Sequence, residues 1–243
     1  MKYILSYGGG VNSSALYFHI LNKRLPLDLV IFADTGEELP ETYDAVERMK
    51  NICKKDGIEF VTCQSHHGDL YNYYFSKRAV MSFMRRDCTS KFKISPIRKY
   101  IRNEYGKKET FTMYIGIAWD EATRIRNSDV KYITNSFPFV DDKITRIGNI
   151  KILRENGFKA KKSGCKGCIY NKKTEWLKML IEQPKEFDRH MKLEENNSAF
   201  PRVMLNGRYT LRSFKEKHLN QQSLNSFEDN ESTCDVINGG CFL

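Results

Sequence analysis

The sequence predicts an α/β protein with a doubly wound, mainly parallel sheet and a helical C-terminal region that contains cysteines. Three observations support this fold class. Short apolar runs typical of strands alternate with helix-like segments as far as about residue 150. The run LDLVIFA at 27–33 is apolar throughout, as in strands that are covered on both faces. Beyond residue 150 the alternation stops, so we expect an α/β domain over 1–150 and a helical region over 151–243.

The expected elements follow from periodicity and from end signals. KYILS is too short for a helix and rich in strand formers, whereas the segment that follows the glycines carries apolar residues at helical spacing. A second helix begins near Pro40 and ends at Gly57, with acidic residues early and lysines late. The predicted strands are 2–6, 27–33, 58–63 and 113–119, and the predicted helices are 12–21, 40–57, 95–105 and 174–195, the last interrupted at Pro184.

Charge and composition limit which binding partners and which cellular compartment we expect for the protein. The 243 residues include 40 Lys and Arg against 30 Asp and Glu, a net charge of +10 that favours nucleic acid or phosphorylated substrates. No apolar run approaches the roughly 20 residues that span a bilayer, and the N-terminus lacks a signal-peptide pattern. We therefore expect a cytoplasmic protein without a membrane partner, whose seven cysteines serve chemistry or metal binding rather than disulfides.

The stretch LSYGGGVNSSAL places three glycines between a strand and a helix. Such a loop can present backbone N–H groups to a phosphate at the start of the helix, and the nearby serines add hydroxyl donors. It is not a nucleoside-triphosphatase P-loop, because no Gly-Lys-Ser/Thr follows. It is not the dinucleotide motif either, because Ser13 stands where the third glycine would fall. A glycine turn with a serine cap is the alternative interpretation.

Four segments in order resemble a known family. SYGGGVNSSAL resembles the pyrophosphatase loop (PP-loop) of adenine-nucleotide α-hydrolase-like proteins, and FADTGEELPETYDAVERM, DCTSKFKISPIRKYI and GIAWDEATR are similar to its phosphoadenosine phosphosulfate reductase branch. The resemblance covers roughly residues 3–126 and implies a PP-loop nucleotide-binding domain over 1–150 that takes ATP with Mg²⁺, or phosphoadenosine phosphosulfate. The ATP-binding residues it implies are Ser6, Tyr7, Gly8, Gly9, Gly10, Asn12, Ser13, Ser14, Asp34, Thr35 and Gly116.

This loop departs from the family pattern at two charged positions. Val11 stands where the family pattern frequently has a lysine, and Asn12 stands where it frequently has an aspartate. The missing positive charge must then come from among Lys91, Lys93, Arg124 and Arg126, and we expect Arg124 to hold a phosphate with its two-pronged guanidinium. Any Mg²⁺ would rely on phosphate oxygens, water and Asp34, although Asp34 can also be read as part of a simple turn.

The motif GCKGC places Cys165 and Cys168 at a spacing used by zinc and iron–sulfur sites. One pair supplies only two ligands, so a metal site would also need Cys88, Cys234 or Cys241. The pair can instead be a redox dithiol or sulfur relay, with neighbouring lysines that favour the thiolate, or a purely structural turn.

Within the resemblance, DNA phosphorothioation ATP pyrophosphatases fit best. The function this implies is cleavage of ATP to AMP and pyrophosphate, which activates a nucleic acid (DNA rather than tRNA) for sulfur insertion, with a cysteine desulfurase as sulfur donor. The catalytic residues expected are Arg124, Cys88, Cys165 and Cys168. The alternatives are a tRNA thiolation enzyme, a non-catalytic nucleotide-binding subunit and a thiol-dependent phosphoadenosine phosphosulfate reductase. That last group's C-terminal E-C-G-x-H is absent here, although Cys241 could play a similar part.

Overall fold

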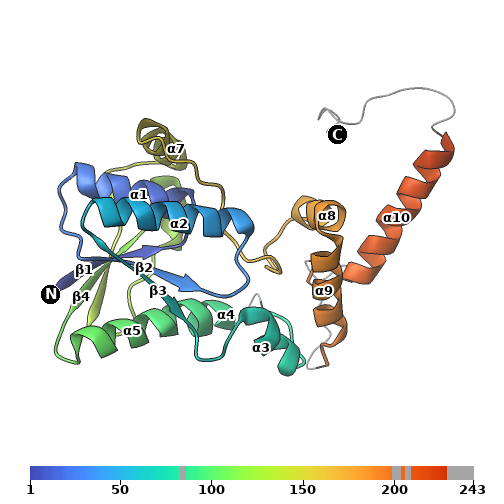
Figure 1. The fold of residues 1–243 in the computed structure, drawn as a ribbon, viewed down its shortest axis with the longest axis horizontal. Helices are drawn as coiled ribbons and strands as arrows, with labels where there is room; N and C mark the ends of the chain where they lie inside the picture. Colours follow the sequence, from blue (N-terminus) through green and yellow to red (C-terminus); the bar gives the residue numbers. More distant parts are fainter. Residues whose placement is uncertain (83–85, 199–203, 206–208, 229–243) are drawn as a thin grey trace. The chain divides into compact units, whose positions relative to one another are not determined.

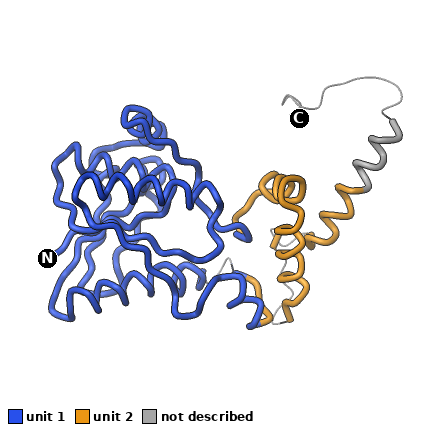
Figure 2. The backbone as a smooth tube through the Cα atoms, viewed as in Figure 1, with its two compact units in different colours: residues 1–77, 81–168 blue, residues 78–80, 169–243 orange. Residues whose placement is uncertain are grey.

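The computed structural model describes residues 1–82, 86–198, 204–205 and 209–228, and it divides the chain into two compact units. Residues 1–77 and 81–168 form the first unit, and residues 78–80 and 169–243 form the second (Figure 2). We describe each unit by itself.

The first unit is built on a five-stranded parallel sheet with the order β3-β2-β1-β4-β5 (Figure 1). The predicted fold class is confirmed. The edge strand β5 was not predicted, because its four residues ITNS are too few and too polar to form a strand pattern. The strands are β1 (Lys2–Tyr7), β2 (Leu29–Asp34), β3 (Glu59–Gln64), β4 (Phe111–Ile115) and β5 (Ile133–Ser136).

Alternate residues of the central strands pack into two cores. Leu5 and Phe32 point to the face covered by α1 (Val11–Asn22) and α2 (Pro40–Lys55), whereas Ile4 and Ile31 point to the face covered by α5 (Ser95–Tyr105). Figure 1 shows these helices as two layers on either side of the sheet. Because both faces are covered, β1 and β2 are apolar at nearly every position, which is the pattern by which they were predicted.

The fourth strand ends earlier than predicted. β4 stops at Ile115, and Trp119–Arg124 forms the short 3-10 helix η2 instead of continuing the strand. The amide of Trp119 donates to the carbonyl of Ile144, so the chain has turned away from the sheet at this point. The remaining short elements of this unit are α3 (Leu70–Ser76), α4 (Asp87–Thr89), the π-helical turn η1 (Ser90–Ile94) and α6 (Pro138–Asp141).

The segment from residue 146 to residue 168 belongs with the sheet. Helix α7 (Arg146–Glu155) packs against α1, and Leu153 and Phe158 are buried in the same core as α1 and α2. The change of character that the sequence suggests near residue 150 reflects the end of the strands, whereas the compact unit extends to Cys168.

The second unit is helical, with α8 (Lys173–Glu182), α9 (Pro184–Glu195) and α10 (Leu211–Glu228). Trp176 and Phe187 meet edge to face in its core, with ring centroids 6.1 Å apart. The buried carboxylate of Glu194 accepts the amides of Met204 and Leu211, each at 2.6 Å, and so holds the start of α10. Within the described residues, no helix has the length and apolar character needed to cross a bilayer.

Candidate functional site: the carboxyl edge of the sheet

The strand order changes direction between β1 and β4. The chain moves outward from β1 through β2 to β3 on one side, and β4 and β5 lie on the other side. Open parallel sheets bind ligands at such a switch point, beyond the carboxyl ends of the strands. Three loops converge there: the glycine loop 8–10 after β1, the loop 35–39 after β2, and the segment 116–126 after β4.

The glycine loop packs closely against α2. Gly9 has φ +69°, and a Cβ there would lie 2.6 Å from Cγ2 of Thr42, so only glycine fits without strain. The amide of Gly8 donates to Oγ of Ser13 at 3.1 Å, and α1 starts after Gly10 without a side-chain cap. The uncapped helix start beside a tight glycine turn is the geometry that binds phosphate.

Gly116 allows β4 to approach the start of α1. A Cβ on Gly116 would lie 2.9 Å from the amide nitrogen of Ser13 and 3.0 Å from the carbonyl carbon of Asn12. Backbone atoms cannot move aside as a flexible side chain would. Gly116 therefore fixes the spacing between the glycine loop and the segment that carries Arg124.

Two residues of the predicted ATP-binding set face inward. The hydroxyls of Tyr7 and Ser14 lie 2.9 Å apart, and Tyr7 also donates to the carbonyl of Ala45 at 3.2 Å. Both side chains are buried, and burial raises the pKa of Tyr7. The Tyr7 and Ser14 side chains therefore pack in the core next to the glycine loop. Ser6 instead lines a cavity at the end of β1.

Asn12 connects the glycine loop to the segment after β4. Its Nδ2 donates to Oε2 of Glu121 at 2.7 Å, and its Oδ1 accepts from Nδ2 of Asn149 at 3.1 Å. The other oxygen of Glu121, Oε1, pairs with Arg124 at 2.8 Å. A carboxylate therefore lies beside position 12 after all, that of Glu121 in η2, although the residue at position 12 is itself an amide.

A cavity of 290 Å³ opens beside this chain of contacts, on the α5 side of the sheet. Its lining is largely apolar and includes three guanidinium groups, those of Arg98, Arg124 and Arg126. Arg98 pairs with Asp129, which also lines the cavity. Apolar surface beside guanidinium groups suits a flat apolar ring joined to an anion. Of the four candidate cations, Arg124 and Arg126 line this cavity, while Lys91 pairs with Asp87 at 3.1 Å. The lining includes Ser6, Met113, Ile115, Ile117, Arg124, Arg126, Ile133 and Phe137.

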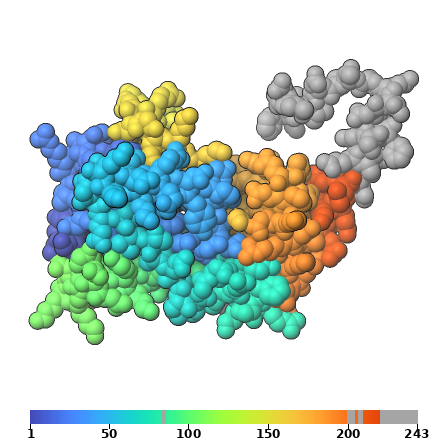
Figure 3. All heavy atoms as spheres, in the orientation of Figure 1, coloured from blue at the N-terminus to red at the C-terminus, as the bar shows by residue number. Residues whose placement is uncertain are grey.

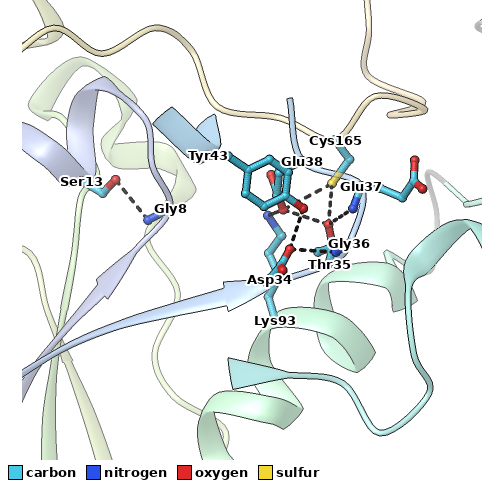
Figure 4. A network of polar contacts seen from close by, with 10 residues as sticks. All are labelled: Gly8, Ser13, Asp34, Thr35, Gly36, Glu37, Glu38, Tyr43, Lys93 and Cys165. Carbon is cyan, nitrogen blue, oxygen red and sulfur yellow. Dashed lines mark hydrogen bonds and ion pairs between the residues drawn. The ribbon is translucent and has the colours of Figure 1, made fainter. Parts of the chain in front are cut away.

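Asp34 is held by three groups of its own unit. Its Oδ1 accepts from the amide of Gly36 and from the hydroxyl of Tyr43, each at 2.8 Å, and its Oδ2 accepts from Gln64 at 3.0 Å. Figure 4 shows the contacts of Asp34 with Gly36 and Tyr43. Asp34 therefore acts first as a loop anchor, and a ligand would share oxygens that are already hydrogen-bonded.

The segment that carries the cysteine motif pairs with the loop after β2. Cys165 and Glu38 form an antiparallel bridge, in which Leu39 donates to the carbonyl of Gly164 at 2.9 Å and Lys166 donates to that of Glu37 at 2.8 Å. A Cβ on Gly10 would lie 2.6 Å from Oγ of Ser163, so the same segment passes against the glycine loop. This pairing joins two motifs that are about 130 residues apart in the sequence.

Glu38 is the centre of a buried polar cluster, drawn in Figure 4. Its Oε1 accepts from Thr35 at 3.0 Å, from Lys93 at 2.9 Å and from the thiol of Cys165 at 3.7 Å. The side chain of Glu38 is fully buried, and its Oε2 has no hydrogen-bond partner among the residues that the structure describes. Burial opposes the charge on Lys93, but the Glu38 carboxylate outweighs it and raises the pKa of the ammonium. The sequence did not indicate Glu38, because nothing local distinguishes it from Glu37.

The expectation of a thiolate at the cysteine motif is wrong for Cys165. Burial, followed by the adjacent Glu38 carboxylate, raises the pKa of this thiol to about 12. The Lys93 ammonium acts in the opposite direction but does not overcome these two effects. In this arrangement Cys165 is a protonated thiol at neutral pH.

The other predicted cysteines are only partly brought together. Cys88, on α4, is half-buried, and burial raises its pKa while Lys93 opposes the increase. The amide of Cys168 donates to the carbonyl of Cys165 at 3.1 Å, which closes the turn between them. Cys234 and Cys241 lie outside the described residues. Among those that are described, no three His, Cys, Asp or Glu side chains are placed to hold a metal ion, so a metal site would need a ligand from elsewhere.

Comparison with known proteins agrees with this architecture. A model of the phosphoadenosine phosphosulfate reductase domain matches residues 2–140, and the chain belongs to this family. The family consists of enzymes that act on adenylated nucleotides, and the chain thus has a nucleotide-utilising, sulfur-related function. A comparison with curated proteins found no match.

Two solved structures are similar to the chain at low identity. One is phosphoadenylyl-sulfate reductase from Candida auris in a phosphate complex, at 12% identity over 66% of this chain and 75% of that chain, with a TM-score of 0.47. The other is the U34-tRNA thiolase NcsA from Methanococcus maripaludis with its 4Fe-4S cluster, at 15% identity over 92% of this chain and 73% of that chain, with a TM-score of 0.47.

Proposed function

We propose that the protein is an ATP pyrophosphatase that adenylates a nucleic acid for sulfur insertion, with DNA phosphorothioation as its reaction. One observation carries the proposal: the segment with Cys165 pairs with the loop after β2 and passes Gly10 at close range. A sulfur-bearing side chain and a phosphate-binding loop therefore share one edge of one sheet. That arrangement suits a reaction in which nucleotide chemistry activates an oxygen and sulfur replaces it.

The nucleotide half of the reaction uses the switch point. The glycine loop and the start of α1 would bind the phosphates, and the 290 Å³ cavity would take the adenosine. A substrate oxygen attacks the α-phosphorus, and the bond to the bridging oxygen of pyrophosphate breaks. Arg124, at the cavity rim, would hold the phosphate from which pyrophosphate leaves. Mg²⁺, when bound with ATP, neutralises phosphate charge, and Asp34 and Glu121 are the carboxylates on these loops that could share it.

The sulfur half uses the cysteine motif. Glu38, which accepts from the Cys165 thiol at 3.7 Å, would take its proton as Cys165 attacks the outer sulfur of a cysteine desulfurase persulfide. The persulfide formed on Cys165 then attacks the activated phosphorus through its outer sulfur and releases AMP. The thiol of Cys168 then attacks the inner sulfur, which leaves the phosphorothioate on the nucleic acid and a Cys165–Cys168 disulfide. An external thiol must reduce this disulfide before the next cycle, so the two electrons are accounted for.

Three alternatives make different use of the same residues. A thiol-dependent phosphoadenosine phosphosulfate reductase would bind its substrate in the same cavity and attack it with a cysteine, and the family match favours this reaction class. In a cluster enzyme, Cys165 and Cys168 would hold a zinc ion or an iron–sulfur cluster together with Cys88, Cys234 or Cys241. A tRNA thiolase would act on a base rather than on a phosphate.

The deciding experiment supplies the protein with ATP labelled at the α-phosphate, with and without DNA or tRNA, and separately with labelled phosphoadenosine phosphosulfate plus a dithiol. We expect labelled AMP and pyrophosphate from ATP, with release stimulated by DNA. Sulfite from phosphoadenosine phosphosulfate, with no AMP from ATP, would establish the reductase instead. Stimulation by tRNA alone would redirect the proposal to thiolation, and nucleotide binding without any product would indicate a non-catalytic subunit.

The cysteine motif is tested by the double variant Cys165→Ser, Cys168→Ser, with Cys63→Ser on β3 as the matched control. We expect the double variant to lose sulfur incorporation but to keep most of its ATP cleavage. Loss of both activities together with a lower Tm that a chelator reproduces in the wild type would show that a structural metal holds the motif. Full sulfur incorporation in the double variant would refute its role and leave Cys88 as the candidate.

A further inference from the structure

The positive charge of the chain is concentrated in one short stretch. Residues 143–166 contain eight basic side chains and the single acid Glu155, a net charge of +7 out of the +10 of the whole chain. The remaining 219 residues are close to neutral. The eight basic residues are Lys143, Arg146, Lys151, Arg154, Lys159, Lys161, Lys162 and Lys166.

This stretch forms an outer surface of the first unit. Helix α7 stands on α1 with Leu153 turned inward, while Lys151 and Arg154 are exposed; in Figure 3 this part of the chain is the yellow projection. The loop that follows adds Lys159 and Lys161, which are also exposed. We call the exposed side of 146–162 the α7 surface.

A cation from another element joins the α7 surface. The exposed Arg48 of α2 donates to the carbonyl of Lys159 at 2.7 Å, and its guanidinium lies over the ring of Phe158, 5.0 Å from the centroid. These contacts leave the positive charge of Arg48 uncompensated by either partner. Arg48 is therefore fixed beside the α7 surface. Two lysines of the surface lie near acids, Lys151 at 3.9 Å from Glu155 and Lys161 at 3.1 Å from Glu41.

Apolar side chains lie between the charges. Ile147 and Ile150 are 80% and 45% exposed on α7, and a hollow of 350 Å³ opens beside Ile150. Phosphates need cations, whereas the faces of bases and sugars need apolar contact, so alternation of the two suits a polynucleotide better than a free anion. The hollow is lined by Val11, Ile150, Leu153, Arg154, Gly157, Phe158, Lys159 and Ala160.

The α7 surface is continuous with the glycine loop. Val11 lines the hollow and is also the first residue of α1, directly after Gly10. At its other end the surface leads into Ser163, which contacts Gly10. The ten residues of α7 span about 15 Å, which is long enough to lie along more than one phosphate of a nucleic-acid strand.

From these observations we infer that the α7 surface binds the sugar-phosphate backbone of a nucleic-acid strand and leads that strand to the glycine loop. The delivery role rests on the proposed function of that loop, whereas the binding itself does not. DNA and RNA share the phosphodiester chemistry that the surface recognises, and the experiment separates them.

The test measures fluorescence anisotropy of end-labelled 20-nucleotide single strands, one DNA and one RNA of the same sequence, between 50 and 300 mM salt. The variant is Arg154→Gln, Lys159→Gln. The control is Lys107→Gln, Lys108→Gln, which removes the same net charge from the exposed loop that precedes β4. Binding of ATP is measured for all three proteins under the same conditions.

Each phosphate contact contributes about 0.7 to the slope of log K against log salt for a single strand, so losing two lowers the slope by about 1.4. At 0.1 M salt this corresponds to roughly 25-fold weaker binding. We expect that loss in the variant and little change in the control, with ATP binding equal in all three. The stronger-binding strand identifies DNA or RNA as the partner.

Equal weakening in variant and control would show only a net-charge effect and would overturn the assignment. So would wild-type protein that binds neither strand, a result that would leave an acidic protein as the partner to seek. If the strands bind as expected but ATP does not, the α7 surface stands and the proposed function of the glycine loop fails.

Discussion

The substitution Asn12→Asp restores the aspartate of the family pattern, and we expect it to destabilise this protein. Nδ2 of Asn12 donates to Oε2 of Glu121 at 2.7 Å. Aspartate at that position would turn a charge-assisted hydrogen bond into a contact between two carboxylates. The residue that is normal in relatives is therefore unfavourable here, because Glu121 already supplies the negative charge.

The magnitude follows from the contacts of the two side chains. Loss of a hydrogen bond to a charged acceptor costs about 1.5–3 kcal/mol. Two carboxylates about 4 Å apart repel by about 4 kcal/mol at an effective dielectric constant of 20. The Glu121 side chain is 26% exposed and can rotate outward, and the start of α1 favours a negative charge by up to about 1 kcal/mol. We therefore expect a net loss of about 2 kcal/mol in the free energy of unfolding at pH 7.

The pH dependence has a definite sign. Repulsion raises the pKa of the new carboxyl pair in the folded state, so the folded variant binds more protons than the unfolded chain between about pH 4 and 7. The destabilisation is fully present above about pH 7, shrinks as the pH falls through the raised pKa values, and is gone near pH 4. Mg²⁺ bridging the two carboxylates would likewise reduce it.

The assay is a double-mutant cycle by urea unfolding with Asn12→Asp, Glu121→Gln and the combined variant. The combined variant exchanges donor and acceptor, so an amide again faces a carboxylate, and its stability should return to within about 1 kcal/mol of the wild type. The expected coupling energy is about 2 kcal/mol, within the range of about 0.5–3 kcal/mol for residues in direct contact. A coupling energy near zero would refute the contact between the loops.

Three further outcomes test the rest of the site. Gly9→Val should abolish ATP binding, because a Cβ on Gly9 would lie 2.6 Å from Thr42. Gly8→Ala should keep ATP binding, because a Cβ on Gly8 would have only ordinary contacts at 3.8 Å or more. Calorimetric titration with ATP measures both. Cys165, with its pKa near 12, should react with iodoacetamide at pH 8 roughly a thousandfold more slowly than a free cysteine, as read by peptide mass spectrometry, and Glu38→Gln should speed the reaction. The raised pKa of Lys93 makes its pairing with Glu38 a stabilising contribution that is complete below about pH 10 and lost as the pH rises further. Lys93→Met should therefore lower the urea midpoint at pH 7 and have a smaller effect at pH 11, and an equal effect at both would contradict the ion pair.

Local patterns were sufficient for the parts of the fold that depend on local physics. The continuous apolar run at 27–33 indicated a strand covered on both faces before the strand order was known, and the structure places Phe32 in one core and Ile31 in the other. The strand β5 was not predicted from the sequence, because the residues ITNS form a strand only through their pairing with β4. Its stability comes from tertiary hydrogen bonds that a one-dimensional pattern does not contain.

Some features of the site depend on local sequence and could be predicted, whereas others depend on tertiary contacts and could not. Gly9 could be placed in the loop from the sequence, because a tight turn before a helix demands glycine whatever the surroundings are. The protonation state of Cys165 could not be predicted from the sequence, because it depends on burial and on Glu38. These two residues meet only through the pairing of residues 163–166 with the loop after β2. Neighbouring lysines in the sequence suggested a thiolate, yet the carboxylate of Glu38, about 130 residues earlier in the sequence, lies beside the thiol and raises its pKa.

The same reasoning explains why a departure from a family motif need not mean a loss of function. Read alone, asparagine at position 12 removes a negative charge from the loop. In the structure its amide group binds Glu121 and Asn149, and Glu121 in turn holds Arg124, so the charge has moved from the helix to the neighbouring loop and remains at the same edge of the sheet. A motif records which residue carries a charge, whereas the chemistry depends only on where the charge lies. The swap of Asn12 and Glu121 in the double-mutant cycle tests this equivalence directly.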